Sequence, residues 1–238
     1  MRFAFSLFLL LLVSWACIKK PPEQSPKTFC SLNDLPGNLQ DGIVTYYPFC
    51  NNTNDAGGKN NGTLTGGNFV SDRSGNPKSA LALTSDSSIV CSSNLYDGAQ
   101  IFTISVWLKT TSIDYGRVIV FDESQCDHVN DWDRTIFINE GQAGFYVFPG
   151  SIQNISGGPN ISDDKWHHLA ATLGTDGMKL YVDGNLVASH SAVTSAQSFS
   201  GFWRIGSFQK TTPVGSYDDV IIYNRALSSS EIRQLYQL

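Results

Sequence analysis

The sequence predicts an all-β protein, and three observations support this prediction. Residues 166–173 and 178–183 alternate apolar or small side chains with polar ones, and Asp-Gly turns interrupt them, so the segment 165–189 reads as three short antiparallel strands. Aromatic residues make up 12% of the chain and charged residues only 16%, as expected for a sheet-rich core. The 21 glycines supply the turns that many short strands require. Helical content should therefore be low.

One helix is predicted, at the end of the chain. Ser228 and Glu231 form an S-x-x-E capping box, and Ile232, Leu235 and Tyr236 lie three and four residues apart on one helical face. This short helix would close the domain. A chain of 238 residues fits one large β-domain, because all-β domains often reach ~200–250 residues.

Four segments carry a resemblance to a known family. They read GIVTYYPF at 42–49, FTISVWLK at 102–109, WHHLAAT at 166–172 continued by KLYVDG, and YDDVIIYNRALS at 217–228. These motifs resemble those of the laminin G-like branch of the concanavalin A-like lectin and glucanase jelly rolls. The resemblance implies a two-sheet antiparallel β-sandwich over residues 39–238.

The first residues predict export. The apolar run at 4–15 is short for a membrane span and has the length of a secretory signal, which we place at residues 1–16. The SWAC sequence at 14–17 resembles a bacterial lipoprotein signal, in which Cys17 is acylated, and residues 17–38 would then form a lipid-anchored tether. We expect a bacterial cell-envelope location, at the outer membrane or cell surface, with the lipid as membrane contact. A plain signal peptide and secretion are the alternative.

The cysteine count agrees with lipidation. The chain has five cysteines, and removing Cys17 leaves an even set in an exported protein. That set predicts two disulfides among Cys30, Cys50, Cys91 and Cys126. Four cysteines allow three pairings, so the connectivity stays open.

Charge and motifs exclude several function classes. The formal net charge is −5 and no basic cluster offsets it, which argues against a nucleic-acid partner. Glucanases of the resembled superfamily carry two glutamates in an E-x-D-x-x-E strand, and this chain has no such pair among its four glutamates. The common hydrolase and nucleotide-binding motifs are also missing. His167 and His168 should point to opposite faces of a strand. We therefore expect a protein that is not an enzyme.

A structural calcium ion is the metal hypothesis. Asp55 lies in a loop rich in glycine and asparagine, whose oxygens suit a hard cation. Laminin G-like domains of this type often hold calcium between this loop and the aspartate of the closing D-D-V strand. The resemblance therefore implies a calcium site here. The matching positions are Asp55, carbonyl groups near Asn60 or Asn61, and Asp218. The loop is shorter than the family pattern and Lys59 adds a positive charge, so a turn without metal is the alternative.

The acidic loop at 122–133 is the predicted ligand site. Carbohydrate sites combine an aromatic platform with carboxylate and amide groups, and Trp132 among Asn130, Asp131 and Asp133 has this composition. In the alternative, Trp132 caps the sheet and the charges form a solvated rim.

These observations lead to one functional hypothesis and two rivals. We expect a non-catalytic surface module that binds a glycan or mediates adhesion. The first rival is a structural or protein-interaction domain of a surface assembly. The second is a glycan hydrolase or lyase whose site follows none of the known motifs. The fold itself cannot choose among them, because sites are grafted onto sandwiches independently.

Overall fold

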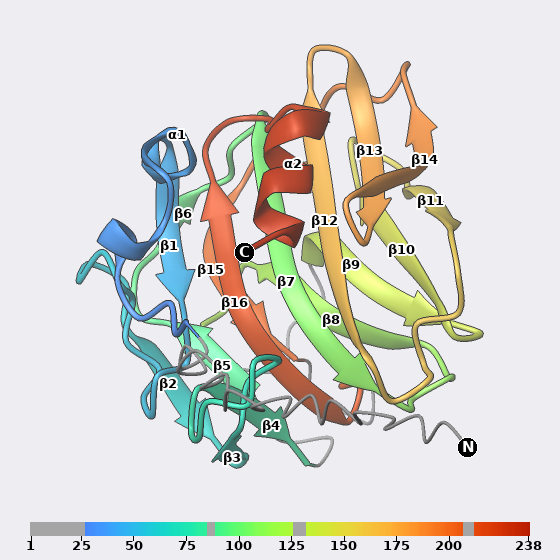
Figure 1. Ribbon diagram of the computed structural model, residues 1–238. Helices are drawn as coiled ribbons and strands as arrows, with labels where there is room; N and C mark the ends of the chain where they lie inside the picture. Colours follow the sequence, from blue (N-terminus) through green and yellow to red (C-terminus); the bar gives the residue numbers. More distant parts are fainter. Residues whose placement is uncertain (1–26, 85–88, 126–131, 207–211) are drawn as a thin grey trace, which may run out of the picture.

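The computed structural model describes residues 27–84, 89–125, 132–206 and 212–238 (Figure 1). In this part of the chain, two eight-stranded antiparallel sheets pack face to face as a sandwich. The predicted all-β jelly roll with a short C-terminal helix is confirmed. We call the sheet that carries helix α2 the front sheet and the other one the back sheet.

The front sheet has the strand order β14-β13-β12-β7-β16-β4-β3, with β1 paired to β16. Its strands are β1 (Ile43–Tyr47), β3 (Asn68–Val70), β4 (Ala80–Leu83), β7 (Phe102–Thr110), β12 (Trp166–Gly174), β13 (Gly177–Val182), β14 (Asn185–His190) and β16 (Gly215–Tyr223). The predicted three-strand segment is thus β12, β13 and β14. Its turns have positive φ at Gly177 (104°) and at Asp183 (50°) and Gly184 (73°), as their sequences require.

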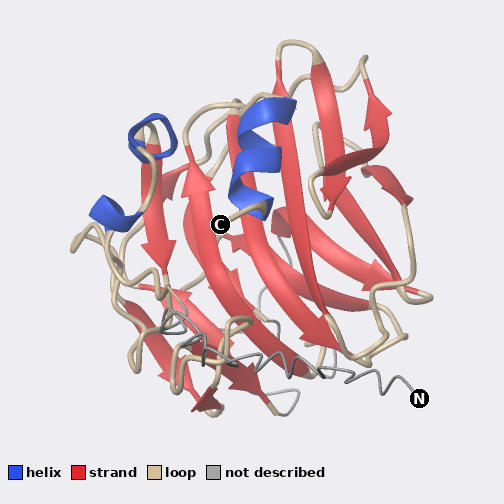
Figure 2. Cartoon of the chain, viewed as in Figure 1, coloured by secondary structure: helices blue, strands red, loops and turns tan. Residues whose placement is uncertain are grey.

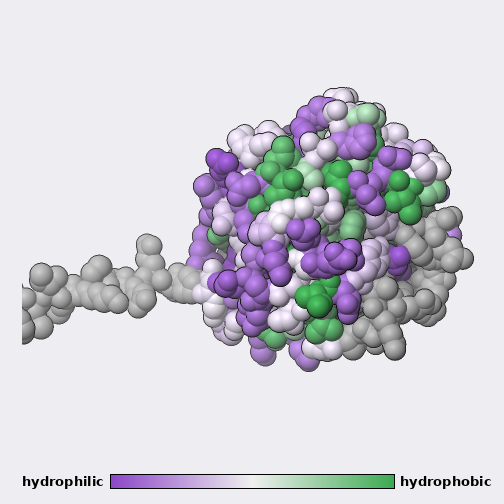
Figure 3. All heavy atoms as spheres, turned by 90° about the vertical axis from the view of Figure 1, so that its right-hand side faces the viewer, coloured by the Kyte–Doolittle hydropathy of each residue, from purple (hydrophilic) through white to green (hydrophobic). Residues whose placement is uncertain are grey.

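The back sheet has the order β11-β10-β9-β8-β15-β5-β2, with β6 paired to β15. Its strands are β2 (Gly62–Thr65), β5 (Ile89–Ser92), β6 (Tyr96–Asp97), β8 (Gly116–Asp122), β9 (Trp132–Asn139), β10 (Gln142–Val147), β11 (Gln153–Gly157) and β15 (Ser200–Ile205). The edge strands of the two sheets meet at β11 and β14, where Gly158 packs against Val187. Figure 3 shows this side, with apolar side chains dispersed among polar ones.

The main core lies between the sheets and follows the two-residue period of the strands. On β7, Ile104 and Val106 are fully buried in this core, whereas Ser105 and Trp107 face the opposite side, toward helix α2. Each fully buried aliphatic side chain of this kind stabilises the fold by about 1.5–3 kcal/mol. The sandwich is therefore held together mainly by apolar contacts across the two inner faces.

A second core covers the outer face of the front sheet (Figure 2). It is formed by the 3₁₀ helix η1 (Leu32–Asp34), helix α1 (Gly37–Gln40) and helix α2 (Ser229–Tyr236). The predicted capping box is present, because the Ser228 hydroxyl accepts from the Glu231 amide and the Glu231 carboxylate accepts from the Ser228 amide. Ile232 and Leu235 then pack on the sheet. Within the described ranges, the helices are too short or too polar to cross a membrane.

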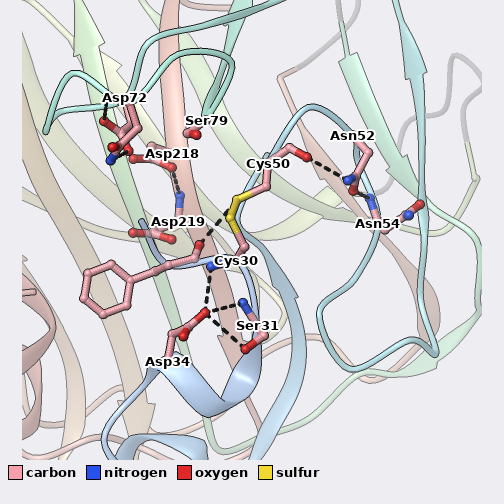
Figure 4. Close-up of a disulfide and its surroundings, with 12 residues drawn as sticks. Cys30, Ser31, Asp34, Cys50, Asn52, Asn54, Asp72, Ser79, Asp218 and Asp219 are labelled. Carbon is pink, nitrogen blue, oxygen red and sulfur yellow. Dashed lines mark hydrogen bonds between the residues drawn. A yellow bond between two sulfur atoms is a disulfide. The ribbon is translucent and has the colours of Figure 1, made fainter. Parts of the chain in front are cut away.

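A disulfide joins the N-terminal segment to the loop after β1 (Figure 4). Cys30 and Cys50 are bonded, with their Cα atoms 5.8 Å apart, so one of the predicted disulfides is confirmed. Cys91 is disulfide-bonded as well. Cys126 and the predicted lipidation residue Cys17 lie outside the described residues.

Candidate functional site

A groove of about 480 Å³ lies at one end of the front sheet. It is formed by Ile101 before β7, by residues 172–181 of the β12–β13 hairpin, and by residues 225–231, which lead into helix α2. In Figure 1 these segments meet at the upper end of the molecule. The volume falls within the roughly 300–1,000 Å³ of typical small-ligand sites.

Local sequence fixes both walls of this groove. The hairpin wall turns at Thr175 and Asp176, and Gly177 permits the tight turn because a Cβ atom there would lie 2.5 Å from the His190 carbonyl oxygen. The opposite wall is the start of α2, which the Ser228 capping box holds in place. Each wall is therefore held by local contacts, although about fifty residues separate the two in sequence.

The hairpin wall carries one ion pair. The ammonium group of Lys179 donates to the carboxylate of Asp176 three residues earlier. This hydrogen bond lowers the pKa of Asp176 and raises the pKa of Lys179. The Asp176 side chain is 65% exposed at the rim and the Lys179 side chain 27% exposed, so the pair faces the space in which a ligand would lie.

The helix wall carries a second ion pair, which is more firmly held. Arg225 Nη1 lies 2.7 Å from Glu231 Oε1, and its other donors reach the backbone oxygens of Asp41 and Asn38, both at 2.8 Å. Burial alone would raise the pKa of Glu231, but hydrogen bonds from Ser228 and Arg225 hold it below its usual value. The groove lining thus contains two acids and two bases, paired within each wall.

Hydroxyl groups and one apolar side chain complete the lining. The hydroxyls of Tyr181 and Ser229 lie 3.1 Å apart, and either can donate to the other. Thr175 and Ser228 are exposed, and Ile101 is 43% exposed. The arrangement can offer hydrogen bonds in both directions together with a small apolar contact.

The family follows from the part of the chain that builds this sandwich. Residues 83–233, more than half of the chain, match the family model described as the concanavalin A-like lectin/glucanases superfamily. The chain belongs to this superfamily. The match includes both walls of the groove. No curated protein matches the chain.

Solved structures show the same fold at low sequence identity. The binding domain of Paraclostridial mosquitocidal protein 1 has a TM-score of 0.66 and 18% identity, over 83% of this chain and 52% of that one. Trypanosoma rangeli sialidase has a TM-score of 0.61 and 16% identity, over 82% and 32%. Domain 4 of the extracellular arabinanase AbnA from Geobacillus stearothermophilus, solved with arabinotriose, has a TM-score of 0.61 and 20% identity, over 82% and 98%. The chain thus spans about half or a third of the first two proteins and nearly all of the third.

The residues predicted to hold calcium do not fit an ion as the structure places them. Both carboxylate oxygens of Asp55 are directed at backbone N–H groups: Tyr46 and Gly57 donate to Oδ1, and Lys59 and Asn60 donate to Oδ2, at 2.9–3.1 Å. Donor hydrogens occupy the positions that a cation would need. Among the described residues, no group of three or more His, Cys, Asp or Glu side chains is arranged to hold a metal ion.

The other predicted calcium positions have partners of their own. The Asn60 backbone carbonyl accepts from the Tyr47 hydroxyl at 2.6 Å, and the Asn61 side-chain oxygen accepts from the Asp55 amide. Asp218 pairs with Arg73 at 2.7 Å instead of facing Asp55. Calcium stays an untested prediction for this superfamily member, and the donors around Asp55 argue against it.

Asp218 belongs to a buried charge cluster beside the disulfide (Figure 4). Arg73 Nη1 lies 2.7 Å from an oxygen of Asp218 and 2.7 Å from an oxygen of Asp219, and the Tyr46 hydroxyl also donates to Asp219. Burial raises the pKa of both aspartates, and repulsion between them adds to the effect at Asp218. The adjoining cavity of about 10 Å³ holds no more than about one water molecule, so this cluster supports the fold.

The prediction that the acidic loop binds a ligand is wrong at Asp133. Asn130 and Asp131 lie outside the described residues, and Trp132 begins β9. Asp133 is fully buried, and its carboxylate accepts from Arg134, Phe148 and Gln197. Its hydrogen bonds hold three segments together, so it cannot contact a ligand at the surface.

The prediction that His167 and His168 point to opposite faces of a strand is confirmed. The groove, in contrast, was not predicted from the sequence. His168 is buried and lies 2.9 Å from the Ser105 hydroxyl, while His167 points the other way and bonds Asp163 and Asp183. The groove is assembled from segments far apart in sequence. Its one local signal was a pair of opposite charges three residues apart in the β12–β13 hairpin.

Proposed function

We propose that this protein is a non-catalytic glycan-binding module and that the groove beside α2 holds the sugar. The observation that carries this proposal is the groove itself, which has the size of a ligand site and is lined by hydroxyl groups and internally paired charges. Saccharides present many hydroxyls and weak apolar faces, and such ligands match this lining.

The comparisons support the same class of ligand. The arabinanase domain, almost all of which aligns with this chain, was solved with arabinotriose, and the mosquitocidal protein fragment is a binding domain. Both resemblances concern the fold, so they favour a binding role here without fixing the sugar.

A non-catalytic role is also part of the proposal. Of the glutamates in the described residues, Glu123 follows β8, Glu140 lies in the β9–β10 turn and Glu231 is in α2. Retaining glycosidases need two carboxyls about 5 Å apart. Among the described residues, the carboxylates in the groove lining are those of Asp176 and Glu231, and each is in an ion pair. Release of reducing sugar from a polysaccharide panel would contradict this part.

Glycan-array binding of the mature protein tests the proposal, with one variant that fills the groove. Thr175→Trp places a large ring on the exposed turn of the groove wall, and it should abolish binding. Thr111→Trp is the matched control, because Thr111 is exposed at the opposite end of β7. Equal loss in both variants, or none in either, removes the groove from consideration. Silence of the unmodified protein on all glycans would favour the protein-interaction alternative.

We propose further that the protein is exported and lipid-anchored at Cys17 in a bacterial cell envelope. The Cys30–Cys50 disulfide supports export, because disulfides persist in oxidising compartments. Mass spectrometry of the mature protein checks the anchor. An acylated N-terminal peptide that begins at Cys17 is expected, whereas an unmodified mature N-terminus would indicate a secreted protein.

A further inference from the structure

The two cations of the groove are held in different ways. Arg225 uses Nε, Nη1 and Nη2 for three separate partners, namely Asp41, Glu231 and Asn38. Its guanidinium would have to give up fold-stabilising hydrogen bonds to reach a ligand. Lys179 is bound to Asp176, the side chain at the turn of its own hairpin. Lys179 is thus the groove cation that is held by a single, exposed partner.

This pairing has a consequence for ligands that carry charge. A saccharide carboxylate entering the groove would meet an ammonium group that is already paired with a carboxylate, and a largely exposed aspartate at the rim. The new charge would gain little from Lys179 and would be repelled by Asp176. An uncharged saccharide meets neither penalty and can use the hydroxyls of Thr175 and Ser229.

We propose that Asp176 sets the charge selectivity of the groove: by pairing with Lys179, it makes the groove bind neutral saccharides in preference to saccharides that carry carboxylates. This is selectivity by a repulsive element placed against the wrong ligand. The inference rests on the proposed glycan-binding function. It names the class of sugar and the residue that discriminates.

The ion pair persists over the ordinary pH range. Lys179 lowers the pKa of Asp176 and Asp176 raises the pKa of Lys179, so both groups stay charged near neutrality. The charged groups that line the groove with them are Arg225 and Glu231, which are paired to each other. Arg225 is held by two further backbone partners and the Glu231 side chain is only 20% exposed, so this pair is less accessible to a ligand charge than Asp176, whose side chain is 65% exposed.

The test compares Asp176→Asn with a matched control. Asparagine keeps the turn, because Asn-Gly is as favourable as Asp-Gly at this kind of hairpin. Asp164→Asn is the control, since Asp164 is an exposed aspartate paired with Lys109 at 3.6 Å and lies outside the groove lining. Both variants change the net charge equally. Binding of arabinotriose, cellotriose, mannotriose and trigalacturonate to the full mature protein is measured by calorimetry at low and high salt.

The unmodified protein is expected to bind at least one neutral trisaccharide and to bind trigalacturonate more weakly. Asp176→Asn should strengthen trigalacturonate binding about fivefold, which is the scale of one exposed ion pair, and should leave neutral binding unchanged. High salt should reduce the gain. Asp164→Asn should leave all affinities unchanged.

Three results would overturn the inference. If neutral trisaccharides bind but Asp176→Asn leaves the acidic-to-neutral ratio unchanged, or if both variants shift it equally, Asp176 does not set selectivity and the glycan-binding function stands. If the unmodified protein binds trigalacturonate at least as well as the neutral sugars, the charge preference is wrong and the function again stands. If no variant binds any of the four sugars, both the inference and the proposed function fail.

Discussion

The guanidinium of Arg134 is completely buried, and its anion is the carboxylate of the preceding residue, Asp133, at 3.0 Å. Arg134 has a positive φ of 48°, which turns its side chain inward toward the ring of Phe121, 4.9 Å away. Its other donors reach the carbonyl oxygens of Ala99 and Gln197. This pair of neighbours therefore joins β9 to two loops that are distant in sequence.

Asp133→Asn should destabilise the protein by about 3–5 kcal/mol, because it leaves a buried guanidinium without an anion. Burial raises the pKa of Asp133 and lowers the pKa of Arg134, so each charge depends on the other. Urea denaturation measures the loss. Asp164→Asn, which removes an exposed partner of Lys109, should cost less than about 1 kcal/mol. Equal small losses in both variants would contradict a structural role for the buried pair.

Arg73→Met should also destabilise the fold, and the loss should depend on pH. Arg73 is shared by Asp218 and Asp219, whose pKa values burial already raises. Without the guanidinium, the carboxylates repel each other near neutral pH, at a cost of about 3–5 kcal/mol. A carboxyl whose pKa is higher in the folded state than in the unfolded state stabilises the fold at low pH, and this stabilisation is lost as pH rises.

The difference in unfolding free energy between Arg73→Met and the unmodified protein should therefore shrink as pH falls from 7 toward 4. Chemical denaturation at a series of pH values measures this difference. A constant difference would mean that Arg73 acts by its packing on Trp107, 4.7 Å away, and not by charge.

The fold was predictable where the signal is local. The turn residues Asp183 and Gly184 adopt the positive φ that their sequence suggested, and the capping box at Ser228 begins α2 as expected. Counting predicted that Cys30, Cys50 and Cys91 form disulfides, but not the Cys30–Cys50 pairing, which depends on two segments meeting in space.

The candidate site could not be predicted from the sequence, and the reason is physical. Composition does not reveal burial, so Asp133 in an acidic loop suggested an exposed binding group although its hydrogen bonds need a dry interior. The groove unites Asp176 with Glu231, and the sandwich topology alone brings their segments together. The carboxylate of a loop aspartate such as Asp55 can either bind a cation or accept hydrogen bonds from backbone amides, and the sequence does not distinguish these two roles.

His168 should make the protein lose stability in acid. Burial, together with a smaller contribution from the charge of Arg73, lowers the pKa of His168 to about 3. An unfolded chain takes up the proton near pH 6.5. The neutral histidine therefore contributes fully above that pH, and the contribution falls by about 1.4 kcal/mol per pH unit between about 6.5 and 3.

His168→Gln isolates this effect from the nearby aspartates, which titrate in both proteins. The difference in unfolding free energy between the unmodified protein and the variant should decline as pH falls through this range. His190→Gln, at an exposed position on β14, is the control. A difference that is flat with pH would show that His168 is not held neutral by the fold.

Asp55 should stabilise its loop without calcium. Four backbone N–H groups donate to its carboxylate, from Tyr46, Gly57, Lys59 and Asn60. Asp55→Asn replaces one acceptor oxygen by an amide that faces these donors, and we expect a loss of about 2–4 kcal/mol. Asp41→Asn, at a side chain that is 86% exposed, is the control and should change stability little.

Calcium separates the two explanations for Asp55. A ligand that binds the native state raises the melting temperature with its concentration. If the donors at Asp55 replace the ion, the melting temperature of the unmodified protein should be the same in calcium and in chelator, and Asp55→Asn should be equally destabilised in both. A calcium-dependent rise that Asp55→Asn abolishes would restore the calcium site. It would also require the loop amides to turn away from the carboxylate, because they and the ion compete for the same oxygen atoms.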